Sequence, residues 1–400
     1  MKARLKFLVV VIIIGAVWLF VLLKLGLWHA TWKPSEGVLS YTFNGWADFP
    51  VSRHLFLAQY EPGFFARGAA YTSYSYPFLF FNFLFLAPFH FLLKLPYEVA
   101  HNFLPYFYVL CLALLLIVTG KEQLLDLLRE KSPLRWVLAF ASIGILVTCP
   151  LPWVALLIYN RDNFHVLAAA AFCYLSTSVF YGDARIPKKP FLVVGVFLAL
   201  WSPLYIPAWI LAFLFINRAI NVERTWILKV AGVSALGALN HVAPKFICVL
   251  AGVQPSDSGF LYRSGLDGST KYMTDIYQAV LSPNDPRHWP FGFYFLLTLI
   301  VGVIFHYLLK GRSQCRPLRQ AFFLLIPYST IAIFFPQFTS IHPYLADQLL
   351  VIPATFLLAF WFLQKEFWGS LTGRTYVAWA LVAGLILMTN LLTIAQNLRR

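Results

Sequence analysis

Uncharged apolar stretches of about 20 residues recur along most of this chain, and each is long enough to cross the hydrocarbon core of a bilayer. The chain is 60% hydrophobic and only 12% charged, whereas soluble domains carry about 25% charged residues. The stretches are apolar on every face, which favours helices over strands. The sequence therefore predicts an all-α polytopic transmembrane bundle of about 11 membrane segments with helical extracytoplasmic loops, with residues 1–400 as a single integral membrane domain.

Lysine and arginine are concentrated in short segments between the apolar stretches. Most of the 31 basic residues fall in six such segments: residues 2–6, 121–135, 185–189, 218–229, 310–319 and 365–374. By the positive-inside rule these segments are cytoplasmic, so we expect a cytoplasmic N-terminus and a bacterial inner membrane or a plasma membrane. Because membrane orientation accounts for the net charge of +15, no nucleic-acid partner is expected.

Two apolar segments do not fit a simple count of crossings. Residues 77–95 contain Pro88 and are expected to form a partial or juxtamembrane helix on the outer side. Residues 190–216 are too short for two full spans, which need about 40 residues, so we expect two short helices that meet at the prolines of 202–207.

The sides of the remaining segments follow because each full crossing moves the chain to the opposite side of the membrane. Residues 29–97 are expected to form a first extracytoplasmic loop with juxtamembrane helices, and residues 253–291 a long extracytoplasmic loop. Residues 136–181 are expected to cross outward and return. Single spans are expected at about 98–119, 225–250, 292–309, 320–335, 348–364 and 375–395.

Asp48 lies in "WADFPVSRHLF" (residues 46–56), shortly after the first apolar stretch. A carboxylate at a membrane edge is costly unless it has a partner or a function. It could be a helix N-cap, since Asp-Phe-Pro could start a helix at residue 49 or 50, or it could be a functional group. Arg53 and His54 follow, and they could face a phosphate or lipid head groups.

A second polar cluster, "NRDN" (residues 160–163), separates two apolar arms. It is either an ordinary turn, which Asn and Asp favour, or a functional cluster that places Asp162 beside Asp48. Lys245 lies near the predicted outer end of a span. Its side chain could snorkel to the interface or bind an anion.

The third cluster is "SIHPYLADQ" (residues 340–348). Capping of the next helix explains Asp347. It does not explain His342 and Tyr344, which could hold a phosphate or a sugar.

The sequence contains no HExxH motif, no Cys/His cluster, no P-loop and no GxGxxG, so no metal or nucleotide chemistry is indicated. No cofactor is therefore assigned. A divalent cation such as Mg²⁺ or Mn²⁺, held jointly by Asp48 and Asp162, is a weaker alternative.

The order of these features resembles the GT-C glycosyltransferases, polytopic enzymes that use polyprenyl-phosphate sugars. The resemblance covers about the first 220 residues: an acid after the first span (Asp48), the outer segment "RHLFLAQYEPGFFARG" (53–68), "YSYPFLFF" (74–81), a second acid (Asp162) and the short broken helix pair at 190–216. This chain has Asp48 alone where the family often has two acids, so the sugar and the acceptor are left open.

The resemblance implies transfer of a sugar from a polyprenyl-phosphate donor to an acceptor hydroxyl on a glycan, lipid or protein, on the extracytoplasmic side and with inversion. A carboxylate would take the acceptor proton, and cations would neutralise the leaving phosphate. The catalytic candidates are Asp48 and Asp162. The candidates for binding the donor phosphate are Arg53, Arg161, Lys245, Arg263 and His342. The candidates for contacting substrate are His54, Tyr74, Tyr76 and Tyr344.

Two other functional classes fit parts of the sequence. A multispanning transporter or flippase of a lipid-linked sugar would use the broken helices at 202–207. A polysaccharide polymerase or ligase of another fold would also carry large outer loops. Membrane lipids are expected partners in each case.

Overall fold

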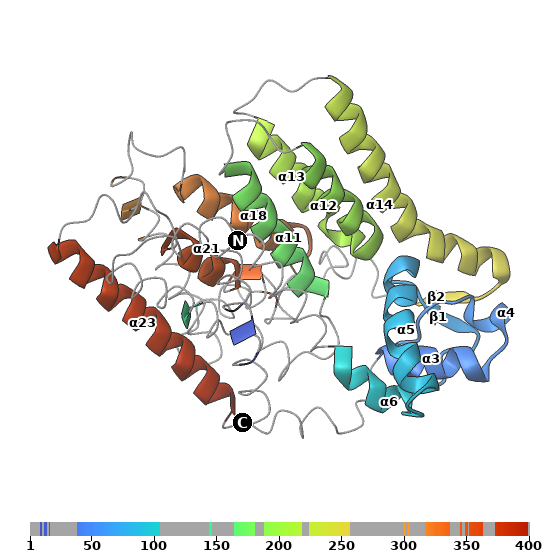
Figure 1. Ribbon diagram of the computed structural model, residues 1–400. Helices are drawn as coiled ribbons and strands as arrows, with labels where there is room; N and C mark the ends of the chain where they lie inside the picture. The colour runs from blue at the N-terminus through green and yellow to red at the C-terminus, as the bar shows by residue number, and fades with distance from the viewer. Residues whose placement is uncertain are drawn as a thin grey trace.

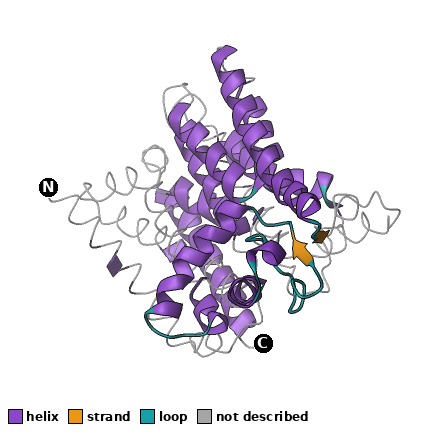
Figure 2. Cartoon of the chain, turned by 90° about the vertical axis from the view of Figure 1, so that its right-hand side faces the viewer, coloured by secondary structure: helices purple, strands orange, loops and turns teal. Residues whose placement is uncertain are grey.

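The computed structural model describes residues 38–104, 164–180, 188–217, 224–256, 317–336, 352–362 and 373–398, with scattered single residues besides. The described part of the chain is mostly helical, as predicted (Figure 2). Three expected spans lie mostly outside the described residues: the N-terminal span, 98–119 and 292–309. The same is true of the first arm of 136–181.

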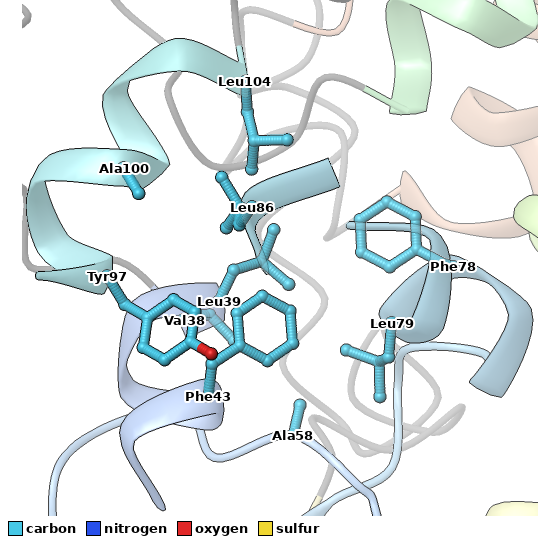
Figure 3. Close-up of a cluster of buried hydrophobic side chains, with 10 residues drawn as sticks. All are labelled: Val38, Leu39, Phe43, Ala58, Phe78, Leu79, Leu86, Tyr97, Ala100 and Leu104. Atoms are coloured by element: carbon cyan, nitrogen blue, oxygen red, sulfur yellow. The ribbon is translucent and has the colours of Figure 1, made fainter. Parts of the chain in front are cut away.

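Residues 38–104 fold into a packed group of short elements, here called the first-loop unit. Its elements are α3 (Val38–Asp48), α4 (Val51–His54), β1 (Ala69–Tyr71), α5 (Tyr76–Phe91), α6 (Tyr97–Ala100) and the 3₁₀ turn η1 (His101–Phe103). Side chains from α3, α5 and α6, with one from the segment after α4 and one after η1, meet in one core (Figure 3): Val38, Leu39, Phe43, Ala58, Phe78, Leu79, Leu86, Tyr97, Ala100 and Leu104. This apolar contact explains why so aromatic a segment folds instead of remaining an open connector.

Helix α5 occupies the segment predicted to be a partial or juxtamembrane helix. It begins after Ser75, whose hydroxyl accepts the Phe78 N–H, with Pro77 in the first turn, where a missing N–H costs nothing. At 16 residues it is about 24 Å long, shorter than a hydrocarbon core of about 30 Å. The short helix is confirmed, and its position relative to a membrane stays a prediction.

The expected pair of short helices is also confirmed. Helix α12 (Lys188–Trp201) ends at Ser202, the 3₁₀ turn η2 (Pro203–Tyr205) follows, and α13 (Ile206–Asn217) returns. The two helices pack closely because the Trp209 indole lies over Gly195, stacks on Phe191 at 4.8 Å and donates to the Phe191 carbonyl at 3.1 Å.

Helix α14 (Arg224–Ala251) runs beside α12 and α13, and its far end reaches the first-loop unit (Figure 1). Among the described helices, only α14 has both the length and the apolar composition to cross a bilayer. After α14 the chain forms β2 (Gln254–Ser256), which pairs in parallel with β1. This two-stranded sheet was not expected in an all-α protein, and it fastens the first-loop unit to the end of α14.

Four further helices complete the described structure: α11 (Phe164–Phe180), α18 (Pro317–Phe334), α21 (Ile352–Phe362) and α23 (Gly373–Leu398). Helix α11 packs against α12, α18 and α21, and α13 also contacts α18. The last three helices lie where single spans were expected, which confirms helices at those positions. Their crossing of a membrane stays a prediction.

The contact between Gly195 and Trp209 gives a test of the α12–α13 packing. A Cβ at position 195 would overlap the indole ring, and such overpacking typically costs about 1–3 kcal/mol. We expect Gly195→Ala to lower the thermal unfolding temperature in detergent. Gly232→Ala in α14 is the matched control because a Cβ there meets nothing within 4 Å. Equal unfolding temperatures for the two variants would contradict this packing.

Candidate functional site

Asp48 is the last residue of α3, and its side chain is exposed. The capping alternative is wrong, because α4 starts at Val51 with Pro50 in the N-cap position. A carboxylate at a helix C-terminus meets the negative end of the helix dipole, which is unfavourable. Within the described residues, no hydrogen bond or ion pair holds the Asp48 carboxylate. The part of the chain that the structure describes therefore gives Asp48 no structural role.

Arg53 lies in the single turn of α4, which follows α3 after only Phe49 and Pro50. Its side chain is exposed, and in the described part of the chain it forms no ion pair. The ion pair that does occur in this unit joins Arg67 to Glu61 at 2.8 Å, and both side chains are exposed. Arg53 is thus a cation available to an anion near the end of α3.

His54 is buried, with only 1% of its surface exposed. Its ring stacks on Trp46 at 6.1 Å and packs against Phe56 at 5.0 Å and Phe65 at 5.9 Å. Burial lowers the pKa of His54 below its ordinary value of 6.5, since desolvation disfavours the charged ring. The expectation that His54 contacts substrate or head groups is therefore corrected, because aromatic rings cover the imidazole.

The two expected tyrosine contacts differ in their exposure and bonding. Tyr76 is half-buried and donates its hydroxyl to the Leu55 carbonyl at 3.2 Å. Burial, with a smaller contribution from Cys248, raises the pKa of Tyr76 to about 12, so this donor stays protonated. Tyr74 is half-exposed between Tyr71 at 5.5 Å and Phe78 at 5.1 Å, and it keeps surface for a ligand.

Lys245 is carried toward this region by α14. Cys248, one turn further along, is buried in a cluster with Leu57 and Phe65 of the first-loop unit. The cluster continues through Val253 into β2. The structure therefore places the α14 turn that carries Lys245, whose side chain is partly exposed, next to the segment that follows His54.

The break between α12 and α13 is bound to the same unit by hydrogen bonds. The Ser75 hydroxyl donates to the Leu200 carbonyl at 2.6 Å, and the Asn240 amide donates to the Ala199 and Leu200 carbonyls at 2.9 Å each. Sequence reasoning did not single out Ser75 or Asn240. Ser75 had a usable signal, because a serine one residue before Tyr-Pro marks a helix N-terminus.

Five predicted site residues lie outside the described residues: Arg161, Asp162, Arg263, His342 and Tyr344. The proposed juxtaposition of Asp48 with Asp162, and a cation held between them, therefore stay predictions. Among the residues that the structure describes, no three His, Cys, Asp or Glu side chains gather as metal ligands.

Comparison of the chain with protein-family models, with curated protein sequences and with solved structures gave no match.

Ser75 gives a test of how the first-loop unit is fixed to the helices. Ser75→Ala removes both the cap of α5 and the bond to the end of α12, and loss of a cap alone costs about 0.5–2 kcal/mol. We expect a lower unfolding temperature in detergent. Ser52→Ala, at an exposed position of α4, is the control and should unfold like the parent. A Ser75→Ala variant as stable as this control would show that the bond contributes nothing.

Proposed function

We propose that this protein is a membrane glycosyltransferase that moves a sugar from a polyprenyl-phosphate donor to an acceptor hydroxyl on the extracytoplasmic side. The observation that carries the proposal is the exposed Asp48 carboxylate, which has no structural role in the described residues and lies close in sequence to the exposed Arg53. The chemistry of these two groups and the GT-C-like order of features both favour a glycosyltransferase.

The reaction needs a base and a cation at the membrane edge. The acceptor oxygen attacks the anomeric carbon, the bond from that carbon to the phosphate oxygen breaks, and the acceptor proton passes to Asp48. The leaving group is a lipid phosphate whose negative charge must be stabilised. Arg53, which is exposed and lies five residues after Asp48, is our first candidate for this role, with Lys245 of α14 as a second. One displacement inverts the configuration of the sugar.

The helices support a donor that is held in a bilayer. Helix α14 has the length and composition of a span, and α5, α12 and α13 are apolar helices of shorter length. Apolar residues face outward on them, including Leu84, Val193 and Leu214. In water such surfaces would be costly, whereas lipid tails cover them without loss.

A transporter or flippase of a lipid-linked sugar is the second candidate, favoured by the break between α12 and α13. The two candidates differ in their products. A transferase makes a new glycosidic bond in detergent, while a flippase only moves its substrate between leaflets of a sealed vesicle.

Asp48 gives the decisive variant. We expect the purified protein to transfer sugar from a polyprenyl-phosphate donor, and Asp48→Asn to slow that transfer by about 10²-fold or more, since the variant keeps the shape but loses the base. Thermal stability should stay the same or rise slightly in both Asp48→Asn and Asp48→Ala, because each removes a negative charge from a helix C-terminus. Transfer rates and unfolding temperatures would be measured on the same preparations.

Glu61→Gln is the matched control, since Glu61 is an exposed acid of the same unit that is paired with Arg67. It should keep normal transfer. A fully active Asp48→Asn protein would exclude Asp48 as the base, and absence of transfer by the parent from every polyprenyl-phosphate sugar tried would contradict the enzyme.

The two ends of α14 test the proposed orientation. Ala251 is exposed at the predicted outer end and Thr225 is exposed at the predicted cytoplasmic end. We expect Ala251→Cys to react with an impermeant thiol reagent in intact cells and Thr225→Cys to react only after permeabilisation. The unsubstituted protein gives the background from its own cysteines. Labelling of both positions from outside would overturn the crossing of α14.

A further inference from the structure

The turn after α4 holds two bulky residues in an unfavourable backbone conformation. Leu55 has φ 51° and Phe56 has φ 54°, both in the left-handed region. Outside glycine, asparagine and aspartate this region is rarely populated, and two apolar residues in succession are unusual. Such a turn persists only where surrounding interactions hold it.

Three side chains hold this turn closed, together with the backbone hydrogen bond from the Leu57 N–H to the His54 carbonyl at 2.7 Å. The Phe56 N–H donates to Nδ1 of His54 at 3.0 Å, Tyr76 donates to the Leu55 carbonyl at 3.2 Å, and the Trp46 indole donates to the Leu57 carbonyl at 2.8 Å. Of these three side chains, only His54 titrates near neutral pH. Because Nδ1 accepts, the neutral ring carries its proton on Nε2. A proton added at Nδ1 would face the Phe56 N–H, and two donors cannot bond to each other.

The same contacts connect the turn to the candidate site. Trp46 stacks on the His54 ring and lies two residues before Asp48 in α3. Arg53 is the residue immediately before His54 in α4. The geometry that His54 sets is therefore also the geometry between the end of α3 and α4.

We propose that His54 is a pH-sensitive positioning residue: its neutral ring keeps the 54–57 turn closed and so fixes Asp48 relative to Arg53, and protonation opens the turn. The effect on catalysis rests on the proposed transferase function. The turn itself does not, because it follows from the hydrogen bonds and the backbone conformation alone.

The surroundings of His54 favour the neutral ring. The side chains packed on it, Trp46, Phe56 and Phe65, are uncharged, and within the described residues no ion pair includes His54. The other titratable groups in residues 46–76 are Asp48, Arg53, Tyr60, Glu61, Arg67, Tyr71, Tyr74 and Tyr76, and those in the last two turns of α14 are Lys245 and Cys248.

The direction of the pH effect follows from the burial. The folded protein binds the His54 proton less readily than the unfolded chain does, because burial lowers its pKa from 6.5. The stabilisation is complete above the unfolded pKa. It is lost as pH falls below 6.5 through the lower pKa of the folded state.

Hydrogen exchange measured by mass spectrometry tests the turn directly. Comparing about pH 7.5 with about pH 5.5, after correction for intrinsic exchange rates, we expect protection of the Phe56 amide to fall at the lower pH in the parent protein. His54→Asn supplies an amide oxygen in place of Nδ1 and should keep that protection at both pH values. His54→Phe keeps the stacked ring without the acceptor and should lose the protection at both.

The Gln254 amide is the internal control, since it donates to the Gly68 carbonyl in the same unit at 2.9 Å. Its protection should not change in the folded variants. The inference is overturned if Phe56 is equally protected at both pH values in the parent, or if His54→Phe protects it as well as the parent does.

Transfer activity is measured on the same proteins. We expect activity of the parent to fall between about pH 7.5 and about pH 5.5, a smaller fall in His54→Asn, and a loss of about 10-fold or more in His54→Phe at the higher pH, since small misplacements of reacting groups cost up to about 10²-fold. The same pH profile in His54→Asn and the parent would overturn the positioning role. Absence of all transfer would refute the proposed function, while the exchange measurement would still decide whether His54 controls the turn.

Discussion

The structure depends on how the carbonyls at the end of α12 are satisfied. A helix leaves its last carbonyls without intrahelical partners, and in apolar surroundings an unpaired carbonyl costs several kcal/mol, on the order of 2–7. Here Asn240 of α14 and Ser75 of the first-loop unit donate to the Ala199 and Leu200 carbonyls. These hydrogen bonds stabilise the break at Ser202. Three parts of the chain, α12, α14 and α5, are therefore held in one arrangement by a few hydrogen bonds.

The same arrangement joins the candidate site to α5 and to the end of α14. The start of α5 is fixed by Ser75, and the next residue, Tyr76, donates to the backbone of the turn after α4. The β1–β2 pairing and the cluster around Phe65 join the same region to the end of α14. Asp48 and Arg53 are exposed on this packed unit, and neither belongs to its buried hydrophobic clusters. We therefore expect the removal of either charged group to cost the fold little.

The sequence predicted the helices well where the determining signals are local. Apolar stretches of limited length and the prolines near 202–207 defined α12, α13 and α14, because hydrophobic period, length and helix-breaking residues act within a few turns. Capping was predicted less well. The sequence left open whether Asp48 is an N-cap or a functional group, and the N-cap alternative is wrong because Pro50 takes that position, since proline fits the extended conformation that precedes a helix. A residue two positions away decided the outcome, and composition could not choose between them.

The sequence by itself determined that the chain is apolar and helical, and it identified Asp48 and Arg53 as charges that need an explanation. Only the tertiary structure decided which polar residues are buried and which are available. His54 looked equivalent to Arg53 in the sequence, yet Trp46, Phe56 and Phe65 enclose it. The left-handed turn at Leu55 and the pairing of β1 with β2 were likewise invisible, because each is held by partners distant in the chain. Local patterns specify helices, whereas burial and strained backbone depend on contacts that form only when remote segments meet.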